Sequence, residues 1–304
     1  MPPTQDSTLP NPLEGPGDYT FTSQVHNDTY DAISSSQMPA TGKSVLISGA
    51  SKGIGRSIAI SFAKSGASQI AIGARSSLSS LIPELKAAAA SANRHEPEIL
   101  SLELNVTDQA SVETAARKVE VKFGKLDIVI NNAGALYNER IVESDPQAWW
   151  QLWEVNIRGP YLVGRSFVPL LLKGGDKTII TISSVGAHLV LSGLSAYQTS
   201  KLAQLRLMEF LSAEYREQAL LAYSVHPGNV PDTDIMGGGE VPDALKHVFV
   251  ETKELCADTL TFLTKEKRDW LAGRYLNCTW DMPEVVEKEK EVVEGDKLKI
   301  RMVM

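Results

Sequence analysis

The chain has 304 residues, 43% of them hydrophobic, which suits one large α/β domain or two small ones. Its net charge of -7 and pI of about 5.4 argue against a nucleic-acid partner. No apolar run reaches the roughly 18 residues of a membrane span, and the N-terminus lacks the basic and apolar regions of a signal peptide. We therefore expect a cytoplasmic protein with no membrane partner.

The two cysteines and the first 40 residues carry no recognisable chemistry. Cys256 and Cys278 lack the spacing of a metal or disulfide framework, so we expect two buried thiols and no metal. Residues 1–40 form an N-terminal arm rich in Pro, Ser, Thr and Gly, which cannot build a core. The arm is either a flexible tail or a segment lying along the body or a neighbouring subunit, with one or two helical turns between Asp28 and Ser36.

A strand, a glycine-rich turn and a helix follow the arm. Residues 43–49 indicate a buried strand, GASKGIG is the turn, and RSIAISFAKSGA is an apolar-periodic helix. Glycines let the backbone approach a phosphate, and the free N–H groups of a helix N-terminus attract the anion. The turn predicts a dinucleotide pyrophosphate site, to which we assign Gly49, Ser51, Lys52, Gly53, Ile54 and Gly55.

The end of the second predicted strand, residues 69–75, bears on the choice of cofactor. Units that bind NAD carry an acidic residue there, which holds the ribose 2′-hydroxyl. Here Ala74 stands at that place and Arg75 follows. A guanidinium pairs with a 2′-phosphate, and Lys52 adds a second cation. The pattern favours NADP(H) over NAD(H), although Arg75 could also be a solvated loop charge.

The alternation of strands and helices continues through the middle of the chain. Helices are expected over 80–92 and 109–123, and strands over 98–106 and 126–135. The last strand runs into Asn132, Ala133 and Gly134, and small residues at a strand's carboxyl end suit a backbone lying against adenine and its ribose. The sequence Asn-Asn-Ala-Gly could also form an ordinary turn.

The next helix carries the run AWWQLWEVNIRGPYLVGRSF. Its tryptophans, Trp149, Trp150 and Trp153, suit a core or a subunit interface better than a cofactor site. Asn156 interrupts an otherwise apolar run, and an Asn inside a helix often marks strain or a functional hydrogen bond.

Residues 178–203 carry the strongest candidate for catalysis. An apolar strand expected over 178–182 leads to Ser184, and the following helix carries Tyr197 and Lys201, four residues apart on one face. An ammonium beside a phenol lowers the phenol pKa from about 10 toward the working range. Ser184 can hold a carbonyl oxygen beside the phenol. The arrangement predicts proton transfer at an oxygen whose carbon gains or loses a hydride, although YxxxK alone occurs on many solvated helices.

The remaining segments are expected to close the fold and the site. Further strands are predicted over 220–230 and 274–280, and 283–304 is a C-terminal extension with a charged helix and a short strand-like tail. Residues 231–250, with three consecutive glycines and two prolines, predict a mobile lid or a plain loop. A mainly apolar substrate pocket is expected from Leu136, Tyr137, Ala187, Leu189 and Met236, with His188 in its wall.

The alternating order predicts an α/β fold: a Rossmann-like, doubly wound parallel sheet of about seven strands with helices on both faces. We expect it to be a single domain over residues 41–282, with the site at the carboxyl ends of the strands.

Six elements make the chain similar to the classical type of the short-chain dehydrogenase/reductase family, over about residues 42–282. They are GASKGIG, NNAG, Asn156, Ser184, YQTSK and HPG, in the family's order and separations. The resemblance implies that Tyr197 is the general acid/base and that Lys201 lowers its pKa and binds the nicotinamide ribose. It also implies that Ser184 stabilises the carbonyl oxygen and that Asn156 holds a water in a proton relay.

The resemblance also assigns the remaining cofactor contacts. It implies adenine contacts by Asn105 and Val106, although the family usually has Asp at the first position. It implies nicotinamide contacts by Pro227, Gly228 and Val230. An extra residue before Thr233 departs from the family's pattern, which puts a phosphate contact by Thr233 in doubt.

The expected function is that of a fungal-type, NADP(H)-dependent reductase of a small ketone or aldehyde, with a role in secondary metabolism. A homodimer or homotetramer is expected, built through the helices that bear Trp153 and Tyr197. One alternative is an alcohol dehydrogenase working in the oxidative direction. The other is a cofactor-binding scaffold without redox turnover.

Overall fold

The computed structural model describes residues 9–231, 233, 235 and 241–302. Its strands form one parallel sheet in the order β3-β2-β1-β4-β5-β6-β7. They are β1 (Ser44–Ser48), β2 (Gln69–Ala74), β3 (Glu98–Glu103), β4 (Ile128–Asn131), β5 (Thr178–Ile182), β6 (Leu221–His226) and β7 (Tyr275–Asn277). The order reverses between β1 and β4, which makes their carboxyl ends the expected place for a ligand. The predicted doubly wound sheet is confirmed.

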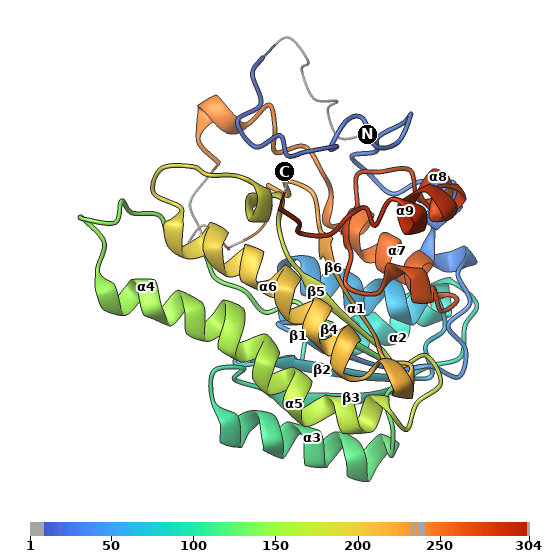
Figure 1. Cartoon of the computed structure of the whole chain (residues 1–304). Coiled ribbons are helices and arrows are strands. Elements are labelled where there is room, and N and C mark those ends of the chain that lie inside the picture. The colour runs from blue at the N-terminus through green and yellow to red at the C-terminus, as the bar shows by residue number, and fades with distance from the viewer. Residues whose placement is uncertain (1–8, 232, 234, 236–240, 303–304) are drawn as a thin grey trace.

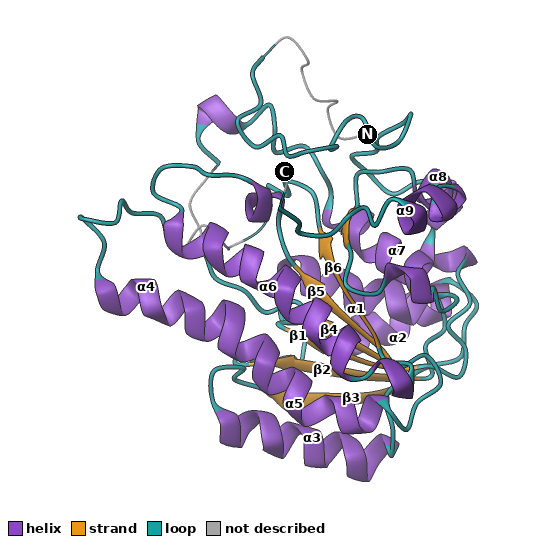
Figure 2. Ribbon diagram, in the orientation of Figure 1, coloured by secondary structure: helices purple, strands orange, loops and turns teal. Residues whose placement is uncertain are grey.

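Helices cover both faces of this sheet (Figures 1 and 2). They are α1 (Gly53–Lys64), α2 (Leu81–Ser91), α3 (Gln109–Phe123), α4 (Pro146–Trp153), α5 (Gly159–Leu171), α6 (Ser195–Glu214), α7 (Lys253–Thr264), α8 (Met282–Glu287) and α9 (Glu289–Glu294). Val45 and Ile47 pack with α1, α2 and α7, whereas Leu46 packs with α3, α5 and α6. Successive side chains of a strand point to opposite faces, so the three middle residues of β1 are apolar on both faces of the sheet.

The helix expected around Asn156 is interrupted. Between α4 and α5 the residues Glu154–Arg158 form a turn of π-helix, with Asn156 fully buried in it. Such a turn contains an extra residue and often occurs at functional sites. The polar residue in the apolar run thus coincides with a break in the regular hydrogen bonding.

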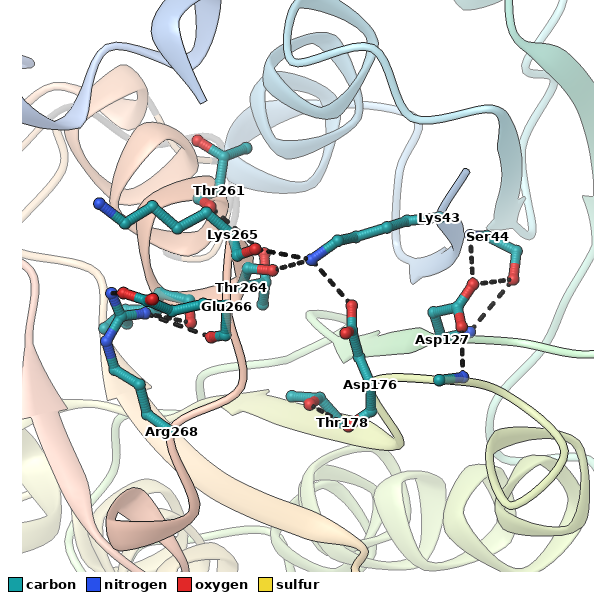
Figure 3. Close-up of polar contacts among 12 residues, drawn as sticks. Lys43, Ser44, Asp127, Asp176, Thr178, Thr261, Thr264, Lys265, Glu266 and Arg268 are labelled. Carbon is teal, nitrogen blue, oxygen red and sulfur yellow. Dashed lines mark hydrogen bonds and ion pairs between the residues drawn. The ribbon is translucent and has the colours of Figure 1, made fainter. Parts of the chain in front are cut away.

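A polar network ties the amino ends of the strands together, on the edge of the sheet away from the glycine turn (Figure 3). Lys43 Nζ pairs with Asp176 at 2.9 Å and donates to the main-chain oxygens of Thr264 and Lys265. Asp127 accepts from Ser44 N and Ser44 Oγ, both at 2.9 Å. The network joins β1, β4 and the segment before β5 to the end of α7.

The described part of the N-terminal arm lies along the body (Figure 1). It contains two 3₁₀ turns, Asp31–Ile33 and Ser35–Gln37, within the stretch where helical turns were expected. Phe21 packs on Trp280 with ring centroids 4.4 Å apart. Tyr30 accepts a hydrogen bond from Met282 N at 2.8 Å. The arm therefore docks on the segment that follows β7.

The C-terminal extension differs from its expected form. Two short helices, α8 and α9, replace the single charged helix, and residues 295–302 contain no strand. Val285 and Val292 are buried, while the charged residues around them face outward. The prediction of a strand-like tail was wrong: the described tail is joined to the start of β7 by the hydrogen bond from Tyr275 N to Leu298 O, and no ladder of such bonds forms. Since arm and extension both pack on the core, the boundaries at 41 and 282 stay predictions.

Candidate active site

The glycine turn lies between the carboxyl end of β1 and the N-terminus of α1. Gly49 and Gly53 have φ of +68° and +55°, a region that favours glycine. A Cβ on Gly55 would lie 2.3 Å from Gly49 O. Ser51 and Ile54 complete the turn and are half-buried, and Lys52 is exposed. This compact backbone, at the positive end of the helix dipole, fits a dinucleotide pyrophosphate.

The Asn132 side chain supports the turn. Its Nδ2 donates to Ser48 O at 3.0 Å and to Gly49 O at 3.1 Å. Ser48 Oγ accepts from the main-chain N of Asn132 and of Ala133. The side-chain amide therefore fixes the geometry of the turn, and the backbone of residues 132–134 is left to face a cofactor.

Arg75 stands immediately after β2 and is exposed. Among the residues that the structure describes, it has no ion-pair partner. The neighbouring Arg56 differs, because it pairs with Glu84 of α2 and donates to Ser51 O at 3.4 Å. Arg75 is thus a guanidinium at the end of β2 for which the described part of the chain supplies no carboxylate.

Asn105 and Val106 follow β3. The Asn105 Oδ1 accepts from Thr107 N at 3.2 Å and Thr107 Oγ1 at 2.9 Å. Its acceptor is therefore used within the turn, and the amide donor is the group that could face a base. Val106 is buried against Gly159, where an added Cβ would lie 2.9 Å from Val106 Cγ2.

The segment after β6 is held by a buried acid. Gly228 has φ of +90°, and a Cβ there would lie 2.7 Å from Glu251 Cβ. Glu251 accepts from Asn229 N at 2.7 Å. Burial raises its pKa to about 7, although the hydrogen bond from Asn229 opposes the shift. Glu251 therefore fixes the loop containing Pro227, Gly228 and Val230.

Ser184 and Tyr197 meet at the carboxyl end of β5. Ser184 caps the 3₁₀ turn Val185–His188, accepting from Gly186 N at 3.0 Å, and its side chain is hydrogen-bonded to Tyr197. Ser183 points elsewhere: its hydroxyl donates to the main-chain oxygen of Lys201. The hydroxyl of Ser184 therefore lies with that of Tyr197, and the hydroxyl of Ser183 does not.

Lys201 lies one helical turn beyond Tyr197 and is buried. Its Nζ is 5.6 Å from the centroid of the Tyr197 ring and donates to Ile182 O at 2.9 Å. Burial lowers the pKa of Lys201 to about 7. Burial also raises the pKa of Tyr197, and the hydrogen bond from Ser184 offsets this only in part. The expected lowering of the phenol pKa by Lys201 is therefore not found here.

Asn156 uses its side chain within the protein. Its Oδ1 accepts from Ala135 N and its Nδ2 donates to Ala135 O, both at 2.9 Å. Nδ2 also donates to Ser200 Oγ at 3.0 Å. A Cβ on Gly134 would lie 3.7 Å from Asn156 Oδ1 and 3.8 Å from Lys201 Nζ. Asn156 thus holds the backbone that adjoins the Lys201 ammonium.

Two contacts near these residues were not anticipated. Gln204 is buried and donates from Nε2 to Asn156 O at 2.7 Å. Glu251 holds the loop after β6. A Gln one turn after Lys201 was a visible signal, because a polar residue on the buried face of a helix requires a partner. Glu251 gave no such signal, since its neighbours in the sequence predict only a loop.

The other residues singled out from the sequence lie outside the group formed by Ser184, Tyr197 and Lys201. The ring of His188 meets Tyr275 edge-on with centroids 4.6 Å apart, so it faces β7. Tyr137 OH accepts from Asp145 N at 2.9 Å. Met236 lies outside the described residues, as does part of the predicted lid. Cys256 and Cys278 are buried free thiols, as predicted.

The fold and these residues define a class of protein. The family model described as short chain dehydrogenase matches residues 43–240, so the chain belongs to the short-chain dehydrogenase family. Among its relatives is the short chain dehydrogenase pigC of Monascus ruber, which is 52% identical over 308 residues, with 100% of each chain covered. The resemblance inferred from the motifs is confirmed.

Two solved structures share the fold. A 7α-hydroxysteroid dehydrogenase, complexed with NADH and 7-oxo glycochenodeoxycholic acid, superposes with a TM-score of 0.70 at 21% identity, covering 83% of this chain and 97% of that one. A short chain dehydrogenase of Shigella flexneri, complexed with NADP, gives 0.68 at 23% identity, covering 80% and 99%. The shared fold therefore accompanies either dinucleotide and does not by itself select one.

No helix in the described part of the chain is long and apolar enough to span a membrane.

Proposed function

We propose that this oxidoreductase is an NADP(H)-dependent carbonyl reductase. The observation that carries the proposal is the hydrogen-bonded pair of Ser184 and Tyr197 beside the buried Lys201. When bound, NADPH would supply a hydride to the carbonyl carbon. Ser184 would donate a hydrogen bond to the carbonyl oxygen, and Tyr197 would give that oxygen its proton.

The protonation state of Tyr197 fits its proposed role as the proton donor in reduction. Its pKa is raised, so the phenol is protonated at neutral pH and can act as an acid. Oxidation of an alcohol would require the phenolate. The alternative, an alcohol dehydrogenase, therefore needs a further influence that lowers this pKa.

Isotope transfer tests the reaction directly. Purified protein is given NADPH deuterated at nicotinamide C4 and a panel of aldehydes and ketones, and deuterium is sought in the alcohol products. Tyr197→Phe should reduce kcat by about 10²–10⁴-fold and keep NADPH binding. Tight NADPH binding without label transfer to any carbonyl would instead support a cofactor-binding scaffold.

The preference for NADP(H) rests on Arg75, exposed after β2 and without a described ion-pair partner. Arg75→Ala should lower kcat/KM for NADPH by about 10-fold or more and change that for NADH little, because NADH has no 2′-phosphate. Arg117→Ala, on the exposed face of α3, is the matched control. Equal losses with both cofactors would contradict the assignment.

A homodimer or homotetramer is the proposed assembly. Trp150 of α4, Tyr161 of α5 and Phe210 of α6 are 55%, 52% and 56% exposed, an apolar set that suits a subunit contact. Phe210→Glu should reduce the mass measured by light scattering to that of one chain, whereas Val121→Glu on α3 should not. A role in secondary metabolism is also proposed, from the resemblance to fungal-type members of the family.

A further inference from the structure

Four residues beside the candidate catalytic group share an unusual property. His188, Ser224, His226 and Tyr275 each have a buried polar atom with no hydrogen-bond partner among the described residues. The atoms are His188 Nε2, Ser224 Oγ, His226 Nδ1 and Tyr275 OH. We call these residues the β6–β7 polar cluster. Buried polar atoms nearly always have a partner, so several in one place require an explanation.

Strand register places three of these side chains on one face. Ser224 of β6 pairs with Tyr275 of β7, and His226 pairs with Asn277. Alternate residues of a strand point to the same side, so Ser224, His226 and Tyr275 face together. Ala222, on the same face of β6, belongs to the apolar cluster that contains Met208 of α6. The polar face is therefore turned toward the helix that carries Tyr197 and Lys201.

His188 connects the cluster to the catalytic group. It ends the 3₁₀ turn that Ser184 caps, and a rise of about 2 Å per residue puts the two backbones about 8 Å apart. Its ring meets Tyr275 edge-on at 4.6 Å. His226 also lies close enough to His188 and Lys201 for their charges to affect its pKa. The cluster thus adjoins the reacting centre on the β6–β7 side.

The groups in this cluster are uncharged at neutral pH. Burial, with smaller contributions from His188 and Lys201, lowers the pKa of His226 to about 3. Burial also lowers the pKa of His188 and raises that of Tyr275 well above its usual value. A neutral imidazole has one donor and one acceptor nitrogen, and a phenol can do both. Such groups suit a hydroxyl or keto oxygen better than a carboxylate or phosphate, whose charge would stay uncompensated.

The N-terminal arm closes this side of the cluster. Asp18 accepts from Asn277 Nδ2 at 3.1 Å and from Gly15 N at 2.6 Å. Gly15 itself abuts Val185, because an added Cβ would lie 2.4 Å from Val185 Cγ2. Asp18 and Asn277 satisfy each other, so they do not supply the missing partners. The four atoms of the cluster therefore stay without a partner among the described residues, on the side that the arm covers.

We propose that the β6–β7 polar cluster is a binding subsite for a second oxygen of the substrate, a neutral hydroxyl or keto group on the molecule whose carbonyl is reduced. This rests on the proposed function. It assigns the substrate to the class of oxygen-bearing carbonyl compounds, such as hydroxylated aromatic aldehydes or diketones. The orphaned atoms would gain their partners on substrate binding, and an analogue lacking the second oxygen would leave them unpaired.

The test compares benzaldehyde with its 2-, 3- and 4-hydroxy derivatives, using NADPH and the full-length protein. For each aldehyde kcat/KM is measured in the wild type and in Tyr275→Phe, which removes one hydroxyl and keeps the ring. The ratio of hydroxylated to plain aldehyde should fall about 3- to 10-fold in the variant for at least one isomer. Intrinsic reactivity cancels because each aldehyde is compared with itself. His188→Phe, which keeps the edge-on ring contact, should act in the same direction.

Tyr223→Phe is the matched control. Tyr223 OH is also buried without a described partner, but Tyr223 directly precedes Ser224 in β6, so its side chain points to the opposite face of the sheet. Removing the Tyr223 hydroxyl should leave the ratio of kcat/KM for hydroxylated to plain aldehyde unchanged. If Tyr275→Phe leaves the ratio unchanged for all three isomers, or weakens NADPH binding instead, the subsite is refuted, and the cluster holds water or contacts the cofactor.

Failure of the proposed function gives a different result. A wild type that oxidises NADPH with none of the four aldehydes argues against the carbonyl reductase. In that case the dissociation constants of the four aldehydes are measured by calorimetry with NADP⁺ present. The ratio of the value for each hydroxylated aldehyde to that for benzaldehyde is then compared between the wild type and Tyr275→Phe. A preference for a hydroxylated aldehyde that Tyr275→Phe removes would still support the subsite, and no preference would overturn it.

Discussion

Gln204 donates its side-chain amide to the main-chain oxygen of Asn156 at 2.7 Å, inside the π-helical turn that separates α4 from α5. The π turn changes the regular hydrogen bonding of the helix, and Gln204 satisfies the carbonyl at that point. Asn156 in turn holds both main-chain groups of Ala135. A side chain of α6 therefore determines, through Asn156, the position of the backbone beside Lys201.

Gln204→Leu should destabilise the protein and slow the reaction. Leucine has a similar volume but leaves Asn156 O buried and unpaired, at a cost of about 1–3 kcal/mol in the free energy of unfolding. We expect kcat to fall by about 10-fold with little change in KM, because Ala135 and Gly134 shift relative to Lys201. Urea unfolding and steady-state kinetics measure the two effects. Gln109→Leu on the exposed start of α3 is the control, and a similar loss there would refute the explanation.

Glu251 should make stability depend on pH. Its pKa is raised to about 7 in the folded protein, against 4.5 for the ordinary group, so the native state binds the extra proton between these values. A raised pKa contributes stability below pH 4.5 that is lost as the pH rises through 7. The free energy of unfolding of the wild type, relative to Glu251→Gln, should fall by about 3 kcal/mol from pH 4.5 to 8.

The control for Glu251 is Glu294→Gln, whose side chain is exposed on α9. Its difference from the wild type should stay constant over the same pH range. A constant difference for Glu251→Gln as well would mean that Glu251 is not held away from water.

Asp127 should matter for stability and not for catalysis. It accepts from Gly175 N and from two groups of Ser44 at the amino ends of the strands. Burial alone would raise its pKa, but these hydrogen bonds outweigh it and the pKa is lowered. Asp127→Ala should reduce the free energy of unfolding by about 3 kcal/mol at pH 7 and leave kcat unchanged. The difference in the free energy of unfolding between the wild type and Asp127→Ala should shrink as the pH falls through the lowered pKa, because the protonated carboxyl accepts these hydrogen bonds less strongly.

Glu120→Ala is the comparison for Asp127→Ala. Glu120 pairs with Lys173 at 2.8 Å on the surface, where the two side chains are 54% and 52% exposed. Such a pair contributes little to stability. Similar losses in the two variants would show that the network in Figure 3 has no special role.

Gly15→Ala should lower activity through the arm. An added Cβ would lie 2.4 Å from Val185 Cγ2, so either the arm or the turn capped by Ser184 must move. We expect kcat/KM to fall severalfold while the far-UV circular dichroism stays unchanged. Gly175→Ala, where the nearest atom to the new Cβ lies at 3.5 Å, is the control. Unchanged kinetics in Gly15→Ala would show that the arm does not affect the site.

Much of the fold could be predicted from local patterns. The β5 bounds, Thr178–Ile182, and the α3 bounds, Gln109–Phe123, agree with the expected ranges because apolar periodicity and clear ends coincide there. The grouping of Ser184, Tyr197 and Lys201 followed from spacing on one helix and the preceding strand. These are short-range features, which a sequence records directly.

The features that escaped prediction depend on distant contacts. The Asn156 carbonyl in the π turn accepts a hydrogen bond from Gln204, 48 residues further along the chain. The pKa of Tyr197 depends on how tightly the surrounding chain buries it, and adjacent residues do not determine that burial. The docking of the arm depends on residues near the C-terminus. Local patterns predict elements, whereas long-range packing determines how their polar groups are satisfied.

The contact of Asp18 with Asn277 spans 259 positions of the chain. During synthesis the arm is made long before the surface after β7 on which it docks. The arm therefore stays unattached while the residues between them are translated. A bulky fusion at the N-terminus would interfere at this late step, and it would yield a protein whose sheet is assembled but whose site is still uncovered.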